Sequence, residues 1–398
     1  MGQGPGALCR AAAALRGGRR PRRALGRRRA RGRGAASGGA PRGGPVTEIR
    51  VGPGLLGRLP ALVARHAARR RATLVTDSRL AAGLGRTIAA AFRRAGWEAP
   101  LFVLPRGEAA KTLRQAERLW AFLAQTRHER RDPVVALGGG TVGDAAGFGA
   151  ATWMRGVPLV QVPTTLLAQS DSCLGGKTGV NIPVAKNAVG AFHQPALVVA
   201  DPAALAGLPE RDYASGLAEV VKYGLVLDGA FARALDRRWP ELAARRPAAV
   251  AWAVKRALEL KARVVAADER DLSGRRELLN FGHTLGHALE SASGYAVRHG
   301  EAVAFGMRAA VLLSRGRGGL SRPADAALVS DLLARLPSVR VPAGVRAGDL
   351  AERLLMDKKA RGGRPVFVLL KGLARPERTD VVTRAQVLAV LAQLGVRP

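Results

Sequence analysis

Short apolar segments alternate with amphipathic segments along the first half of this chain, and this alternation limits the possible fold more than any other feature. The segments ATLVTD, DPVVALGGG, VPLVQVPTT and ALVVAD are rich in β-branched residues and end near turn residues. Between the first two lie RTIAAAFRRAGW and TLRQAERLWAFLAQ, whose apolar residues recur at helical spacing. Strands that alternate with helices form a mostly parallel sheet. We therefore predict an α/β domain with a parallel, doubly wound sheet over residues 46–208.

The remainder, residues 209–398, is expected to form a mostly α-helical C-terminal domain. A β-rich run returns only at RPVFVLL, near residue 364. Helical periodicity is present in residues 215–226, 247–267, 277–293, 301–315 and 323–335.

Composition narrows the class of protein. The 398 residues, 47% of them hydrophobic, suffice for one large domain or two ordinary ones. Only two cysteines, Cys9 and Cys173, are present, which argues against a disulfide framework and favours a reducing compartment. No apolar run approaches the roughly 18 residues that cross a bilayer. We expect a cytoplasmic protein with no membrane partner.

Residues 1–45 are expected to be a disordered leader. They contain twelve arginines and no acidic residue among Gly, Ala and Pro. Three interpretations stay open: a leader without function, an organelle transit peptide, and a nucleic-acid-binding arm. The segment has a single serine, too few for a typical transit peptide, and it lacks the apolar stretch of a signal peptide. A leader without function is favoured, and nucleic acid is the least favoured partner.

Two of the six histidines, His283 and His287, are four residues apart in RRELLNFGHTLGHALE, and His299 follows in RHGEAVAFGM. The apolar residues around the pair recur at helical spacing, so His283 and His287 should share one face of a helix. Such a pair can bind a metal together, although the glutamate of the H-E-x-x-H zinc motif is absent. A hydrogen-bonded packing role for His287 is the alternative.

The loop ALGGGTVGDAAG follows a predicted strand and precedes a helical segment. Gly138, Gly140 and Gly143 match G-x-G-x-x-G, in which backbone N–H groups hold a pyrophosphate. The acidic residue usual about 20 positions later is missing, because that neighbourhood reads PLVQVP. Nucleotide binding and glycines needed only for packing both stay open for this loop taken alone.

A second glycine-rich stretch, VPTTLLAQSDSCLGGKTGVNIPVAKNAVGAF, contains lysines and an asparagine in apolar surroundings. Small residues let a ligand approach the backbone, and these polar side chains suit anions and hydroxyl groups. Solvated surface lysines are the alternative. The candidate residues are Thr164, Thr165, Asp171, Lys177, Lys186 and Asn187.

Taken together, several blocks resemble the 3-dehydroquinate synthases, members of the sugar-phosphate cyclases. The resemblance covers residues 47–372, in which the blocks occur in the family's order. It implies an N-terminal nucleotide-binding unit and a C-terminal helical unit with the active site between them. The blocks are GGGTVGDAAGF, PTTLLAQSDSCLGGKTGVN, KNAVGAF, SGLAEVVKYG, LLNFGHTLGHALE and HGEAVAFGM.

The resemblance assigns residues to a metal and to NAD. One divalent metal, zinc or cobalt, would be held by Glu219, His283 and His299, and two imidazoles with a carboxylate leave positions open for substrate oxygens. The residues that match NAD-contacting positions are Asp77, Glu108, Lys111, Gly139, Gly140, Asp144, Thr164, Thr165, Asp171 and Lys186.

It also assigns the substrate site. Catalytic roles would fall to Lys177, Lys222, Arg276, Asn280 and His287. The positions matching substrate contacts are Arg155, Asp171, Lys177, Asn187, Lys222, Lys261, Arg276, Asn280, His287 and Lys358 or Lys359. One departure is the segment DERDLSGRR, one residue longer than usual, in which Asp271 stands where a glutamate is expected.

The activity implied is conversion of 3-deoxy-D-arabino-heptulosonate 7-phosphate to 3-dehydroquinate and phosphate in the shikimate pathway, by a homodimer. The steps are transient oxidation by NAD, phosphate elimination, reduction, and intramolecular aldol closure. The alternatives are another sugar-phosphate cyclase and a metal-dependent polyol dehydrogenase of the glycerol-dehydrogenase type.

Overall fold

The computed structural model describes residues 47–355 and 365–398. The predicted leader, residues 1–45, and the candidate lysines Lys358 and Lys359 lie outside these residues. No helix within the described part is both long and apolar enough to cross a membrane.

The first part of the described chain contains a six-stranded sheet in which every neighbouring pair is parallel. The order is β1-β8-β5-β4-β2-β3, and every residue of β4, β5 and β8 is buried. Strands buried on both faces read as continuous apolar runs, which is why the four quoted segments confirm the predicted parallel sheet. The strands are β1 Glu48–Val51, β2 Thr73–Asp77, β3 Leu101–Leu104, β4 Val134–Gly138, β5 Leu159–Pro163 and β8 Leu197–Ala200.

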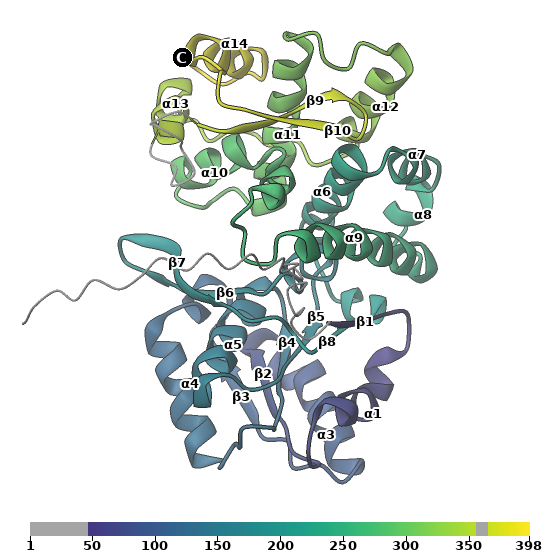
Figure 1. Cartoon of the computed structure of the whole chain (residues 1–398), viewed down its shortest axis with the longest axis vertical. Helices are drawn as coiled ribbons and strands as arrows, with labels where there is room; N and C mark the ends of the chain where they lie inside the picture. Colours follow the sequence, from purple (N-terminus) through teal and green to yellow (C-terminus); the bar gives the residue numbers. More distant parts are fainter. Residues whose placement is uncertain (1–46, 356–364) are drawn as a thin grey trace, which may run out of the picture. The chain divides into compact units, whose positions relative to one another are not determined.

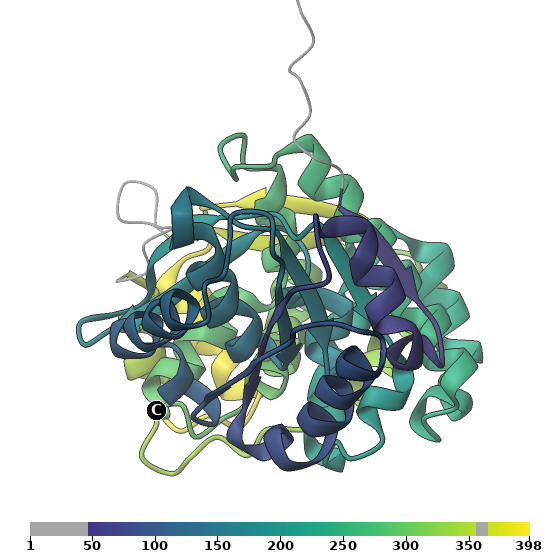
Figure 2. The ribbon, with the colours of Figure 1, turned by 90° about the horizontal axis from the view of Figure 1, so that it is seen from below.

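Helices cover both faces of this sheet (Figure 1, Figure 2). Alternate residues of β4 face opposite sides, so Val135 packs in one core with helices α1 and α3, and Ala136 packs in the other with α4 and α5. The sheet is therefore doubly wound, as predicted. The helices are α1 Leu59–Val63, α3 Arg86–Arg94, α4 Leu113–Gln125 and α5 Gly140–Thr152.

The chain reverses its direction across the sheet at β2. From β2 it passes to β3 on one side, and then to β4, β5 and β8 on the other. Ligands of open α/β sheets bind outside the carboxyl ends of the strands at such a switch point. The carboxyl ends of β2, β4 and β5 are thus the expected nucleotide edge.

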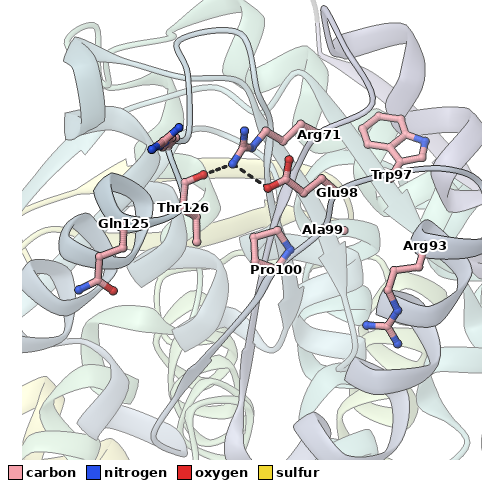
Figure 3. Close-up of a pocket in the computed structure, with 9 residues that line it drawn as sticks. Arg71, Arg93, Trp97, Glu98, Ala99, Pro100, Gln125 and Thr126 are labelled. Carbon is pink, nitrogen blue, oxygen red and sulfur yellow. Dashed lines mark hydrogen bonds and ion pairs between the residues drawn. The ribbon is translucent and has the colours of Figure 1, made fainter.

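The amino-terminal edge of the sheet carries a different pocket, drawn in Figure 3, with Arg71 at its centre. The Arg71 guanidinium donates to the carbonyl oxygen of Thr126 and lies 2.8 Å from Oε1 of Glu98. Thr126 ends α4, so Arg71 places a cation at a helix C-terminus, where it is favoured. Arg71 therefore has a structural role, because it joins the C-terminal end of α4 to the chain just before β2.

The second part of the described chain is mostly helical, as predicted (Figure 1). Its helices pack around one extended apolar core, and β9 and β10 form an antiparallel hairpin at RPVFVLL and the residues after it. The elements are α6 Glu210–Leu227, α7 Gly229–Arg237, α8 Trp239–Ala243, α9 Pro247–Ala267, α10 His283–Ala292, α11 His299–Arg315, α12 Pro323–Ala334, α13 Ala347–Leu355, β9 Phe367–Gly372, β10 Arg375–Thr379 and α14 Arg384–Gln393.

One local expectation needs correction. The helical pattern over 277–293 is interrupted, because the turn Arg275–Asn280 and α10 are separated at Gly282, where φ is +78°. A Cβ at Gly282 would lie 2.5 Å from Cγ of Met307, so only glycine fits there. The glycine-rich stretch forms an antiparallel hairpin of β6 Lys177–Ile182 and β7 Ala185–Phe192.

Candidate active site

The nucleotide edge brings together predicted residues from three neighbouring strands. Asp77 is the last residue of β2, Gly139 and Gly140 follow β4, and Thr164 and Thr165 follow β5. Because β4 lies between β2 and β5, these positions meet at one end of the sheet. The predicted NAD positions therefore lie where the topology expects a dinucleotide.

The glycines of this loop have two separate functions. A Cβ at Gly138 or Gly143 would lie 2.6 Å from Val142 or 2.8 Å from Gln161, so these two glycines are needed for packing. Gly139 precedes α5 and Gly140 begins it, where free backbone N–H groups and the helix dipole favour a phosphate. This partly exposed helix start fits the pyrophosphate of a dinucleotide.

Lys111 contacts two further candidate residues, one from α5 and one from β7. Its buried Nζ lies 2.6 Å from Oδ2 of Asp144 and 2.6 Å from Oδ1 of Asn187. Burial raises the pKa of Asp144, and the charge of Lys111 partly offsets that rise. Glu108 lies 3.6 Å from Nζ of Lys186. The β6–β7 hairpin is thereby tied to the nucleotide domain.

Glu219 is the centre of the predicted metal set. It lies on α6 with no exposed side-chain surface, and Nε2 of His283 and Nε2 of His299 are each 3.4 Å from its Oε1. Among the described residues neither carboxylate oxygen accepts a hydrogen bond, although Nζ of Lys222 forms an ion pair with Oε2. A buried carboxylate whose Oε1 accepts no hydrogen bond and faces two imidazole nitrogens fits a divalent metal with one oxygen and two nitrogen ligands.

The charges around this set are unequal. Burial opposes ionisation of Glu219, but the adjacent Lys222 ammonium and His299 hold its pKa at about 2. Burial and the Lys222 charge keep the pKa of His283 well below its usual value. Burial also disfavours the charged form of His299, yet contacts with Glu219 and Glu290 raise its pKa to about 10. The carboxylates of Glu219 and Glu290 thus concentrate negative charge around the His299 ring.

Glycines allow the three helices of the metal set to approach closely. A Cβ at Gly300 would lie 1.9 Å from the carbonyl oxygen of Ser215 on α6, and one at Gly306 would lie 1.8 Å from that of Gly282. His283 and His299 begin α10 and α11 respectively. The close packing places both imidazoles against the Glu219 carboxylate.

A small pocket opens beside the metal set, lined by Glu277, Asn280, His283, Thr284, His287, Val366 and Val368. The ring centroid of His287 is 5.2 Å from that of His283, which confirms that the pair shares one helix face. Asn280 and His287 therefore line the same pocket as His283 of the metal set. Glu277 and Thr284 also line this pocket but were not predicted from the sequence.

Asp171 connects the two parts of the described chain. Nζ of Lys261, on α9, lies 2.7 Å from Oδ1 of Asp171 and 2.8 Å from its carbonyl oxygen. The Tyr223 hydroxyl donates to the same carboxylate. Burial disfavours its ionisation, but Lys261 and Lys222 hold the pKa of Asp171 at about 2. An ionised Asp171 is thus fixed between the sheet and the helices.

The remaining predicted cations differ in their environment. Nζ of Lys177 lies 2.5 Å from Oδ2 of Asp271, the residue that departs from the family pattern. Arg276 is buried and donates to the backbone carbonyl oxygens of Gly175 and Glu269, at 3.1 and 3.0 Å. Both residues lie where the β6–β7 hairpin meets the turn before α10.

Arg155 lies apart from the other candidate residues of the same chain. It follows the C-terminal end of α5, whose N-terminal end holds Gly140 at the nucleotide edge. A 13-residue helix is about 20 Å long, so Arg155 lies at the opposite edge of the sheet. Its contact with the substrate stays a prediction.

One residue at the metal set was missed in the sequence. Oε1 of Glu290 lies 3.3 Å from Nδ1 of His299. Burial would raise the pKa of Glu290, but contact with His299 keeps it below the usual value. Glu290 is seven residues after His283 and three after His287, so it lies on the same helix face. That spacing was the available signal.

Known proteins carry the same pattern over most of the chain. The family described as 3-dehydroquinate synthase N-terminal matches residues 101–215, and that described as 3-dehydroquinate synthase C-terminal matches residues 216–360. The 3-dehydroquinate synthase of Symbiobacterium thermophilum is 48% identical over 317 residues, covering 79% of this chain and 88% of the relative. That of Rhodospirillum rubrum is 47% identical over 354 residues, covering 86% and 91%.

Solved structures agree with the fold. A 2-epi-5-epi-valiolone synthase from Streptomyces hygroscopicus, with NAD⁺ and Zn²⁺ bound, is 29% identical, has a TM-score of 0.79, and is matched over 88% of this chain and 96% of its own. A 2-deoxy-scyllo-inosose synthase complexed with carbaglucose-6-phosphate, NAD⁺ and Co²⁺ is 27% identical, with a TM-score of 0.77 and coverage of 87% and 96%. With two matching domains and relatives of more than 40% identity over most of both chains, the chain belongs to the 3-dehydroquinate synthase family.

Proposed function

We propose that this protein is a 3-dehydroquinate synthase, a carbon–oxygen lyase acting on phosphates. It converts 3-deoxy-D-arabino-heptulosonate 7-phosphate to 3-dehydroquinate and phosphate, a step of aromatic amino acid biosynthesis. The observation that carries the proposal is the convergence of His283 and His299 on buried Glu219, beside a pocket lined by Asn280 and His287.

NAD and a divalent metal complete this site. NAD supplies a transient hydride acceptor, so it is regenerated within each turnover. The metal, zinc or cobalt as in the two related cyclases, supplies a Lewis acid for neighbouring sugar hydroxyls. Glu219, His283 and His299 would hold the metal, and the backbone at Gly139 and Gly140 would hold the pyrophosphate.

The chain's own side chains bind the substrate and move its protons. Lys177 and Arg276 would hold the leaving phosphate, with Asn187 and the lysines Lys358 and Lys359 as further contacts. Charge-assisted hydrogen bonds fix such a group in one orientation. His287 would transfer a proton at its ring nitrogen, within the pocket shared with Asn280.

Two alternatives use the same scaffold. The two related cyclases are named for other products, 2-epi-5-epi-valiolone and 2-deoxy-scyllo-inosose, so on this scaffold the substrate is chosen by few side chains in the pocket. A polyol dehydrogenase would share the glycine loop and the metal set but has no need for Lys177 and Arg276 as phosphate ligands. The presence of these two cations therefore supports a phosphorylated substrate.

The decisive test is phosphate release from the heptulosonate phosphate by purified protein with NAD and Co²⁺ or Zn²⁺. We expect stoichiometric phosphate and 3-dehydroquinate, with no net accumulation of NADH. Steady NADH production without phosphate release would instead identify a dehydrogenase. Turnover of another sugar phosphate alone would identify a different cyclase.

We also propose a homodimer in the cytoplasm. Arg155 supports the dimer, because it lies too far along α5 to contact a substrate bound in its own chain, whereas a second copy can bring this edge to a pocket. Sparse cysteines support the compartment. Sedimentation analysis of the purified protein measures the oligomeric state.

Removing residues 1–45 should leave catalysis intact. Every block that resembles the family begins after this segment, and the segment has few core-forming residues. The measurement is steady-state kinetics of the truncated protein at two salt concentrations, compared with the full chain. A tenfold loss of turnover at both concentrations would show that the leader belongs to the catalytic fold.

A further inference from the structure

His299 lies between two carboxylates, one at each ring nitrogen. Its Nε2 is 3.4 Å from Oε1 of Glu219, and its Nδ1 is 3.3 Å from Oε1 of Glu290. A neutral imidazole has one N–H donor and one lone pair. The partner of one nitrogen therefore decides what the other nitrogen can bind.

His283 shows the same arrangement with a different partner. Its Nε2 is also 3.4 Å from Oε1 of Glu219, while its Nδ1 is 3.2 Å from the carbonyl oxygen of Phe281. A backbone carbonyl can only accept, so the proton is held on Nδ1 and the lone pair of Nε2 is directed to the metal position. Glu290 occupies the corresponding place at His299.

The helix geometry fixes Glu290 in this place. His283, His287 and Glu290 occupy positions i, i+4 and i+7 of α10, on one face. This helix packs closely on α11, since a Cβ at Gly286 would lie 3.0 Å from the carbonyl oxygen of Ala302. Only 16% of the Glu290 side chain is exposed, so water competes weakly for its carboxylate.

We propose that Glu290 is a positioning residue of the metal site, which accepts the Nδ1 proton of His299 and thereby holds Nε2 of His299 toward the metal. The inference rests on the proposed metal set of Glu219, His283 and His299, but not on which sugar phosphate is converted. Acceptors of this kind raise the basicity of the imidazole and restrict its rotation.

A competing interpretation makes Glu290 a ligand. Atoms of His287, Glu290 and His299 lie within 4.8 Å of one another and could hold a cation themselves. Because Glu290 faces Nδ1 of His299, that cation would take Nδ1, the nitrogen that carries the proton when Nε2 is a ligand. The two sites can be filled together only if the ring loses both protons, so we assign Glu290 to the hydrogen bond.

The test is titration of the metal-free full chain with Co²⁺ against a competing chelator, without NAD or substrate. We expect one Co²⁺ per chain, with a Kd that rises about 10- to 100-fold in Glu290→Ala. Glu290→Gln retains an acceptor oxygen and should show a smaller rise. The matched control is Glu352→Gln, the same charge change at an exposed position of α13, and it should leave the Kd unchanged.

An unchanged Kd in both Glu290 variants would overturn the proposal. Two Co²⁺ per chain in the wild type, falling to one in Glu290→Ala, would identify Glu290 as a ligand and also overturn it. If circular dichroism shows that Glu290→Ala does not fold, Glu290→Gln decides the question. Because no substrate is present, failure of the phosphate-release assay with normal Co²⁺ binding would reject the proposed reaction and leave the role of Glu290 intact.

Discussion

Replacing His283 or His299 with alanine should abolish turnover, because each variant loses the metal. Both Nε2 atoms converge on the same oxygen of Glu219, at 3.4 Å, and they supply two of the three protein ligands. With one imidazole missing, the remaining pair lacks the geometry that holds a divalent ion in a catalytic site. Elemental analysis of the purified variants measures the metal content directly.

His66→Ala is the control for these variants. Nε2 of His66 lies 3.1 Å from Oε2 of Glu48 on β1, outside the metal set, so this variant should retain both metal and turnover. Full metal occupancy in both His283→Ala and His299→Ala would mean that the ion is held elsewhere. The assignment of Glu219 as the central ligand would then be wrong.

The parallel sheet could be predicted because its signals are local. Four of its strands are continuous apolar runs that end near turn residues, as in VVALG of β4, and burial on both faces produces that pattern directly. The β6–β7 hairpin gave no such signal. Its strands are rich in small and polar residues, and Gly179 lies opposite Gly190. A Cβ at Gly190 would lie 2.1 Å from the carbonyl oxygen of Thr178, so the pairing depends on glycines that read locally as a loop.

The metal set could be predicted only in part from the residues themselves. The spacing of His283 and His287 correctly predicts a shared helix face. However, the second imidazole that contacts Glu219 beside His283 belongs to His299. Glu219 lies 64 residues before His283 in a helix that is buried along most of its length. No local pattern marks it as a ligand, because its role arises from packing among α6, α10 and α11. Resemblance to the family supplied this residue.

The positions of Arg155 and Asp271 illustrate a second limit. A motif match identifies the type of residue but does not say at which edge of the sheet that residue lies. Arg155 lies at the edge opposite to the nucleotide loop. Asp271 follows an extra residue in its segment and adopts φ of +55°. Its carboxylate contacts Lys177, so this segment supplies an acidic partner for the lysine, a contact that the motif match alone did not predict.

Lys177→Ala should lower kcat/KM for the phosphorylated substrate by about one to two orders of magnitude. Nζ of Lys177 contacts only Asp271 among the described residues, at 2.5 Å, and 54% of the side chain is exposed, so a phosphate can approach it. A hydrogen bond between charged groups contributes roughly 1.5 to 3 kcal/mol, and about 1.4 kcal/mol corresponds to a tenfold change in rate. Binding of NAD and metal should stay near normal, because neither predicted site includes Lys177.

Kinetics on a pair of analogues, one with the phosphate and one without, separates this role from a structural one. Lys371→Ala is the matched control, since Lys371 is 61% exposed and also pairs with one carboxylate, Glu377, at 2.8 Å; it should change neither rate. A lysine that only joins the hairpin to Asp271 would affect both analogues equally and lower the thermal stability. Equal losses on the two analogues would therefore refute the phosphate contact and favour a polyol dehydrogenase. A loss confined to the phosphorylated analogue is the result expected of a cation that holds the leaving group.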